Sequence, residues 1–278
     1  MKFFKYHACG NDYVYIDCFE NFIEDPGNLS KKISKRRFGI GSDGLIMICP
    51  SDVADAKMRI FNSDGGEAKM CGNGIRCTAK YLYDEMNIKK ENIKIETLSG
   101  IKNARILKTN KNFSVVSVDM GKPEFIPYKI PADFNSENII NVPFNILKEK
   151  YNITCISMGN PHCVIFADNA DNLEKLDIKK IGTAFQNCKK FPEGMNVEFV
   201  KIERKNVLSM RVWERGSGET SACGTGACAA AIASVLNNLS QKEDQIKVIL
   251  KGGEILVDYK NDNVIMTGEA VKVFEGEF

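Results

Sequence analysis

Apolar and polar residues alternate through several short segments in the first half of the chain, which is typical of β-strands with one buried face. The spacing changes once, where Ile75, Ala79, Leu82 and Met86 recur three or four positions apart and predict a helix over residues 75–86. Strands are expected over residues 3–8, 13–17, 45–49, 57–61, 93–96, 101–107 and 113–120.

The second half of the chain shows the same alternation. Helices are expected over residues 172–187 and over the alanine-rich residues 227–236. Strands are expected over residues 155–158, 163–167, 196–203, 208–213, 246–250, 254–259, 264–267 and 271–274. Because strands outnumber helices and short turns join most neighbours, the sequence predicts an α+β fold with mainly antiparallel sheets.

One segment of the chain occurs twice in related form. Residues 59–74 align without gaps on residues 211–226, at an offset of 223 − 71 = 152. Both copies read as a strand, a polar glycine-containing loop, Cys-Gly-x-Gly and a helix. The identical positions are Arg59/Arg211, Gly66/Gly218, Glu67/Glu219, Cys71/Cys223, Gly72/Gly224 and Gly74/Gly226.

A repeat this long indicates two copies of a whole domain, whereas solenoids repeat every 20 to 50 residues or so. We therefore predict an N-terminal half over residues 1–120 and a C-terminal half over residues 121–268. We also expect the repeated Arg–Glu positions to form structural ion pairs. Asn62 and Glu214 occupy one repeat position, which suggests that the two halves treat the two ends of a ligand differently.

Composition narrows the possible partners. The 278 residues are 44% hydrophobic and 27% charged with a net charge of +2, so we expect no nucleic-acid or membrane partner. The ten cysteines are not accompanied by a secretion-type apolar leader, which favours reduced thiols in the cytoplasm. The sequence does not fix the oligomeric state, and a homodimer stands beside the monomer as an expectation.

Metal and cofactor sites are not expected. No cysteines follow a Cys-x2-Cys spacing, and the two histidines, His7 and His162, are far apart in the sequence. The segment from Gly39 to Gly44 fits Gly-x-Gly-x-x-Gly, but a basic segment precedes it and a strand-like segment follows. A dinucleotide-binding turn needs a strand before it and a helix after it.

The two Cys-Gly-x-Gly segments can support acid–base chemistry. A cysteine at a helix N-terminus lies in the positive end of the helix dipole, which favours thiolate, and the following glycines expose N–H groups that can bind a carboxylate. If Cys71 and Cys223 face one ligand, a thiolate can remove a proton from carbon while the opposite thiol donates one. This exchange inverts a stereocentre, and coupling between the thiols keeps their protonation states different.

Several motifs in this order resemble those of the diaminopimelate epimerases, the pyridoxal-independent two-cysteine family of amino-acid racemases and epimerases. The resemblance covers nearly the whole chain. The matching segments are Gly10–Tyr13, Asn62–Gly65, Met70–Arg76, Gly159–His162, Gly194–Asn196, Glu214–Gly216 and Ala222–Gly226.

The resemblance implies interconversion of LL- and meso-2,6-diaminopimelate without a cofactor, in lysine and peptidoglycan precursor biosynthesis. It implies two pseudo-symmetric domains, each a bent, mainly antiparallel sheet around a central helix, with the terminal strand 269–278 rejoining the first half. Cys71 and Cys223 would be the acid–base pair, supported by His162 and Glu214. Substrate contacts would come from Asn11, Asn62, Asn160, Asn196, Glu214 and Arg215, and carboxylate contacts from Gly72, Asn73, Gly224 and Thr225.

Two positions depart from the family pattern. Gly44 stands where some members carry glutamine, and Gly66 stands where serine is common. Two other interpretations also stay open: a racemase for proline or another small amino acid, and a non-catalytic amino-acid-binding protein of the same fold. The paired Asn160 and Arg215 argue against proline, which has no distal group for them to bind.

Overall fold

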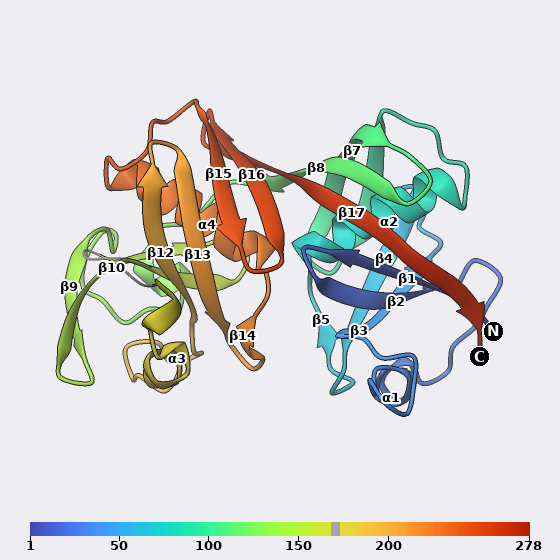
Figure 1. The fold of residues 1–278 in the computed structure, drawn as a ribbon, viewed down its shortest axis with the longest axis horizontal. Helices are drawn as coiled ribbons and strands as arrows, with labels where there is room; N and C mark the ends of the chain where they lie inside the picture. The colour runs from blue at the N-terminus through green and yellow to red at the C-terminus, as the bar shows by residue number, and fades with distance from the viewer. Residues whose placement is uncertain (168–172) are drawn as a thin grey trace. The chain divides into compact units, whose positions relative to one another are not determined.

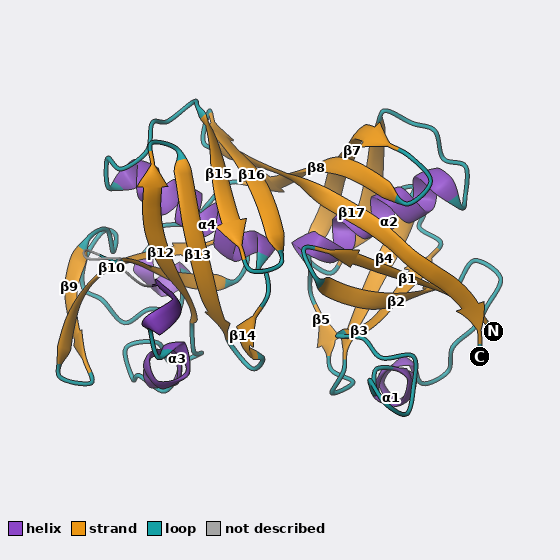
Figure 2. Cartoon of the chain, in the orientation of Figure 1, coloured by secondary structure: helices purple, strands orange, loops and turns teal. Residues whose placement is uncertain are grey.

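The computed structural model describes residues 1–167 and 173–278, and it is rich in strands with few helices (Figures 1 and 2). The chain forms two compact units. Unit 1 consists of Met1–Asp119 and Thr267–Phe278, and unit 2 of Met120–Met266. Within the described residues, no helix is both long enough and apolar enough to cross a membrane.

Eight strands of unit 1 pair in a closed ring, in the order β1-β2-β3-β4-β6-β7-β8-β17 and back to β1. Among the strand pairs of this ring whose residue register is described, β2–β3 and β4–β6 are parallel and the others are antiparallel. The short β5 lies beside β4. The strands are β1 (Lys2–Ala8), β2 (Asn11–Asp17), β3 (Gly44–Cys49), β4 (Ala56–Asn62), β5 (Glu67–Ala68), β6 (Asn92–Thr97), β7 (Gly100–Thr109), β8 (Phe113–Gly121) and β17 (Asn263–Glu277).

Two helices accompany these strands. Helix α2 (Gly72–Asp84) packs against β1, β6 and β7, and its Tyr81 ring meets Phe4 edge-on at 5.1 Å between centroids. Helix α1 (Pro26–Ile33) packs against β3 and β4 and begins at Asp25, whose carboxylate accepts the N–H of Asn28 at 2.9 Å. Almost all of α2 is buried, so the ring of strands surrounds a helix (Figure 1).

Seven strands of unit 2 pair in the order β9-β10-β11-β12-β13-β15-β16, with the short β14 beside β13. The β11–β12 and β13–β15 pairs are parallel. The bounds are β9 (Val142–Ile146), β10 (Glu149–Ser157), β11 (Pro161–Phe166), β12 (Asn196–Arg204), β13 (Val207–Glu214), β14 (Gly218–Thr220), β15 (Gln245–Leu250) and β16 (Gly253–Lys260).

Helix α4 (Gly224–Leu236) contacts β10, β11, β12, β13, β15 and β16. Its residues from Gly224 to Ser234 are all buried, and most are glycine or alanine, whose small side chains let strands approach on every side. The strands of unit 2 therefore also enclose a helix (Figure 2).

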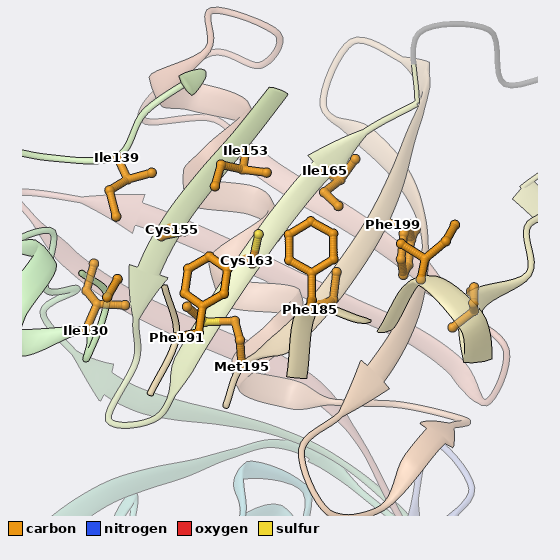
Figure 3. Close-up of a cluster of buried hydrophobic side chains, with 14 residues drawn as sticks. Ile130, Ile139, Ile153, Cys155, Cys163, Ile165, Phe185, Phe191, Met195 and Phe199 are labelled. Atoms are coloured by element: carbon orange, nitrogen blue, oxygen red, sulfur yellow. The ribbon is translucent and has the colours of Figure 1, made fainter. Parts of the chain in front are cut away.

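A second core of unit 2 covers the sheet face turned away from α4. Helix α3 (Ile178–Gln186) contributes Phe185, which stacks on Phe191 at 6.1 Å between ring centroids. Figure 3 shows both rings over the strands that carry Cys155 and Cys163. Two short 3₁₀ turns, η1 (Pro127–Lys129) and η2 (Leu173–Lys175), complete the elements.

The strand-rich character expected from the sequence is confirmed, and every expected strand overlaps an observed one. Several boundaries and elements differ. Helices α2 and α4 each begin three residues before the apolar periodicity does, because a cysteine caps a first turn that is rich in glycine. The expected strands 264–267 and 271–274 are parts of the single strand β17, and α1 and β9 were not expected.

The helix expected over residues 172–187 is wrong at its start. Residue 172 lies outside the described residues, residues 173–175 form η2, and α3 begins only at Ile178. Asp177 ends the irregular stretch, because its side chain accepts the N–H of Lys180 at 3.0 Å and caps α3.

Candidate active site

Cys71 occupies the N-cap of α2, with φ −141° and ψ 113°. Its sulfur accepts the N–H of Gly74 at 3.3 Å, so one of the unpaired donors of the first helical turn points at the thiol. A Cβ on Gly74 would lie 2.8 Å from Cδ1 of Ile46, which explains why glycine stands there. The expected cysteine at a helix start is confirmed, and the lowered pKa expected for Cys71 stays a prediction.

Asn11 and Asn73 lie at the same thiol. The Cys71 thiol donates to Oδ1 of Asn11 at 3.5 Å, and the Asn73 amide donates to the same oxygen at 3.3 Å. The fully buried Arg76 in turn donates to Oδ1 of Asn73 at 2.8 Å. Asp43 accepts from the Asn11 amide at 2.8 Å. Asp43 and Arg76 therefore hold the side-chain amides of Asn11 and Asn73 in place, which fixes the polar groups around Cys71.

Asn62 ends β4 and is exposed, and it stands opposite Gly44 of β3. A Cβ on Gly44 would lie 2.2 Å from the carbonyl oxygen of Phe61 and 2.9 Å from the Tyr13 ring. The glutamine that some family members carry at this position therefore has no room here. The Gly44 departure therefore has a structural cause in this chain.

Cys223 occupies the N-cap of α4 with nearly the same backbone, φ −121° and ψ 112°, but its side chain is buried. Its sulfur lies 3.4 Å from Oγ1 of Thr225. Burial raises the pKa of the Cys223 thiol well above its usual range, and the Glu214 carboxylate raises it further. The lowering expected from the helix dipole is wrong for this cysteine, because desolvation and nearby carboxylate charge outweigh it.

Glu214, the last residue of β13, is hydrogen-bonded to the Cys223 thiol. The Thr220 hydroxyl donates to its Oε1. Burial raises the pKa of the Glu214 carboxyl, while its bonds with Thr220 and Cys223 partly offset that rise. A carboxyl group with a raised pKa beside a protonated thiol can hold or pass a proton.

His162 is completely buried on β11, and its neighbours were only partly expected. Its Nε2 lies 3.1 Å from Oδ1 of Asn160, and its Nδ1 lies 2.6 Å from Oε1 of Glu198. Glu198 is also completely buried. Side chains at 162 and 198 point to the α4 side of the sheet, because their strand neighbours Cys163 and Val197 point into the opposite core.

Nitrogen, oxygen and sulfur atoms of His162, Glu198 and Cys223 all lie within 4.8 Å of one another. These residue types also bind zinc. Both ring nitrogens of His162, however, already have hydrogen-bond partners, Glu198 at Nδ1 and Asn160 at Nε2. The arrangement fits a group that shares protons better than it fits a metal site.

Asn196 and Arg215 meet at the backbone. Oδ1 of the buried Asn196 accepts the N–H of Arg215 at 2.8 Å. The Arg215 guanidinium is largely exposed and donates to the carbonyl of Glu193 at 2.8 Å. Asn196 thus fixes the loop that carries Arg215, while the guanidinium keeps further donors for a carboxylate.

In unit 1 the structure places Asn11, Gly72 and Asn73 around Cys71, and Asn62 lies at the end of β4, opposite Gly44. In unit 2 it places Asn160, His162, Glu214, Gly224 and Thr225 around Cys223, and Asn196 beside Arg215. Sequence reasoning missed Arg76, Asp43 and Glu198. For Glu198 a signal existed, since a lone carboxylate interrupts the apolar run Val-Glu-Phe-Val of β12.

Comparison with known proteins gives one consistent result. The family model described as diaminopimelate epimerase matches residues 3–126 and 154–273. A diaminopimelate epimerase of Acetivibrio thermocellus is 47% identical over 279 aligned positions, which cover 100% of this chain and 98% of that protein. One of Methanococcus maripaludis is also 47% identical and covers 100% of this chain and 99% of that protein.

Solved structures share the fold at low sequence identity. A phenazine biosynthesis protein of the PhzF family from Bacillus anthracis has a TM-score of 0.73 at 19% identity, covering 100% of this chain and 98% of that chain. A hydroxyproline epimerase from Agrobacterium vitis has a TM-score of 0.68 at 14% identity, covering 100% and 90%. Taken with the full-length sequence matches, these findings mean that the chain belongs to the diaminopimelate epimerase family.

Proposed function

We propose that this enzyme interconverts LL- and meso-2,6-diaminopimelate by moving protons between the substrate α-carbon and two cysteines. The observation that carries the proposal is the pair of cysteine N-caps, one in each unit, in a chain of this family. Each thiol lies where the N–H groups of a first helical turn are unpaired, so each can act beside a bound carboxylate.

In the proposed reaction, one cysteine as thiolate takes the α-proton, and the other as thiol delivers a proton to the opposite face of the carbon. Negative charge grows on the substrate carboxylate as the proton leaves. N–H groups at Gly72-Asn73 and Gly224-Thr225 stabilise that charge. The raised pKa of Cys223 makes it the protonated partner in the resting enzyme, and Glu214 and His162 support its proton transfer. No cofactor is needed for these steps.

The rest of the substrate would be held by Asn11, Asn62, Asn160, Asn196, Glu214 and Arg215. The exposed guanidinium of Arg215 suits the distal carboxylate, because it can bind both oxygens in a planar pair. The contrast between Asn62 and Glu214 supports different treatment of the two substrate ends. A proline-type racemase would have no use for a distal carboxylate site.

We further propose that the two units descend from one duplicated domain, close to the halves 1–120 with 269–278 and 121–268. The order of pairing supports this. Strands β1 to β4, β6 and β7 follow the same sequence of parallel and antiparallel pairs as β10 to β13, β15 and β16. In both sets a cysteine-capped helix follows a two- or three-residue strand, β5 or β14.

The ten cysteines are all free thiols, which supports a reducing compartment such as the cytoplasm. There the product would serve lysine and peptidoglycan precursor synthesis. A homodimer remains the assembly to test against the monomer, by light scattering of the purified chain.

The proposal is tested by following the substrate α-hydrogen in deuterated water. We expect reduced enzyme to convert LL-diaminopimelate to a mixture with the meso form and to introduce deuterium at the inverted carbon. L-Proline is the matched control and should neither invert nor exchange. Binding of diaminopimelate without exchange would favour a non-catalytic binding protein, and turnover of proline would favour the racemase alternative.

A further inference from the structure

Glu198 is a buried carboxylate without a full set of partners. Its Oε1 lies 2.6 Å from Nδ1 of His162. Its Oε2 has no hydrogen-bond partner among the described residues. Leaving a buried ionised carboxylate half-satisfied is costly, so a structure that keeps one must gain something from it. The strand neighbours of Glu198 are the apolar Val197 and Phe199, which makes a packing role a poor explanation.

The hydrogen bonds of His162 fix a proton count. Its Nε2 faces the Oδ1 acceptor of Asn160, so Nε2 carries a hydrogen. Its Nδ1 faces the Oε1 of Glu198, and two acceptors cannot bond without a proton between them. The Glu198–His162 pair therefore holds a second, shared proton, on the carboxyl or on the ring.

We propose that Glu198 is a positioning residue that keeps this second proton on the Glu198–His162 pair beside Cys223. When Cys223 is a neutral thiol, the proton rests toward the carboxyl. When Cys223 has given its proton to the substrate, the shared proton moves to Nδ1 and places an imidazolium beside the thiolate. No proton enters or leaves the pair, so the thiolate is stabilised and is ready to take the next α-proton. This inference rests on the acid–base role proposed for Cys223.

Other titratable groups face the pair. Glu214 and Cys223 face it from β13 and the start of α4, whereas Cys163, next to His162 on β11, points into the opposite core. Burial raises the pKa of the Cys163 thiol well above its usual range, so this group stays neutral. An ionised Glu198 with a neutral His162 would add a second negative charge near Cys223 and would raise its pKa. The proposal predicts the opposite influence of Glu198, and that difference can be measured.

The experiment compares wild type with Glu198→Gln, which keeps the size of the side chain and can still donate to Nδ1. Glu203→Gln, at an exposed position further along β12, is the control for the same chemical change. Alkylation of Cys223 by iodoacetamide is followed across pH by peptide mass spectrometry. We expect Glu198→Gln to slow Cys223 alkylation at pH 8 about 10-fold, equal to a rise of about one pKa unit. Turnover should fall mainly in kcat, with KM little changed.

Unchanged or faster alkylation of Cys223 in Glu198→Gln overturns the proposal, since it would mean that Glu198 acts only as a negative charge or not at all. Alkylation of Cys71 in the same samples shows that unit 1 is intact. If the variant does not fold, nitrogen NMR of wild type decides, because only two histidines are present. A neutral His162 ring that carries its hydrogen on Nδ1 and none on Nε2 would contradict the second proton, because Glu198 would then be ionised. Neither readout needs turnover, so a failed epimerase assay is distinguishable from a failed role for Glu198.

Discussion

The two cysteine turns of this protein have the same backbone and different chemistry. Cys71 and Cys223 both cap a helix from an extended conformation, and each is followed by Gly-x-Gly. Cys71 is half-buried and meets the amide of Asn11, whereas Cys223 is buried and meets the carboxylate of Glu214. Both thiols therefore lie at the same kind of helix terminus. The strands around it decide how each thiol titrates.

The difference extends to the sheet position behind each turn. Position 46 on β3 is Ile and the equivalent position 198 on β12 is Glu, at the same offset of 198 − 46 = 152 that separates the cysteines. Both side chains reach the second glycine of the Cys-Gly-x-Gly segment, Gly74 or Gly226. One apolar contact in unit 1 has therefore become a buried proton-sharing contact in unit 2.

The largest effect is expected from removing either sulfur. Cys71→Ala and Cys223→Ala should each reduce inversion by about 10² to 10⁴-fold, the range of a lost general acid or base. Circular dichroism should stay unchanged, because neither sulfur fills a large volume. Initial rates of LL-diaminopimelate conversion provide the measurement. Full turnover in either variant would show that the two turns are not equal partners.

The next largest difference between the two cysteine turns is expected from adding a methyl group at the second glycine of each Cys-Gly-x-Gly segment. In Gly226→Ala the new Cβ would lie 2.6 Å from Oε1 of Glu198, which is pinned by His162, and in Gly74→Ala it would lie 2.8 Å from the end of Ile46. Ile46 can change rotamer, whereas Glu198 cannot move without breaking its bond. Gly226→Ala should cost about 1–3 kcal/mol of unfolding free energy and Gly74→Ala less. Urea denaturation measures both, and equal costs would contradict this view of Glu198.

Replacing the two repeated arginines should lower the stability of the protein by different amounts, and this difference is expected to be smaller than the effects above. Arg59–Glu67 and Arg211–Glu219 both form two parallel hydrogen bonds of 2.8–3.1 Å, so the expected structural pairs are confirmed. Arg211 also donates to the carbonyls of Leu173, Glu174 and Leu176 around η2.

Arg211→Ala should therefore cost about 1–3 kcal/mol, because it leaves carbonyl groups unsatisfied. Arg59→Ala should cost about 0.5–1 kcal/mol, as expected for a half-exposed ion pair. The two melting temperatures, measured under one set of conditions, give the comparison. A greater loss for Arg59→Ala would show that the bonds to the η2 carbonyls contribute little.

The smallest effect is a pH dependence confined to unit 2. Burial raises the pKa of folded Glu214 above its unfolded value, so the folded state holds this proton more tightly. Wild-type stability then falls as pH rises through the window above the unfolded pKa. Glu214→Gln does not titrate, so its stability relative to wild type should grow as the pH rises from 4 to 8. Asn62→Gln, at the equivalent position in unit 1, should show no such trend.

Much of this molecule was already determined by local sequence. The 152-residue repeat predicted two equivalent cysteine turns, alternating residues predicted the strands, and motif order predicted the family. Short-range spacing can carry this information, because strand alternation, helix caps and glycine turns depend on residues close along the chain. Ring closure by β17 could not be predicted so directly, since it pairs residues 2–7 with residues 271–277.

The protonation behaviour of the site was decided by tertiary structure. From the sequence alone, Cys223 and Cys71 were both expected at the positive end of a helix dipole, and therefore both were expected to have a lowered pKa. Folding buries Cys223 and brings Glu214 against it from β13, while β12 brings Glu198 against His162 on β11. Desolvation and contacts between distant strands set a pKa, and neither is visible in the spacing of residues along the chain.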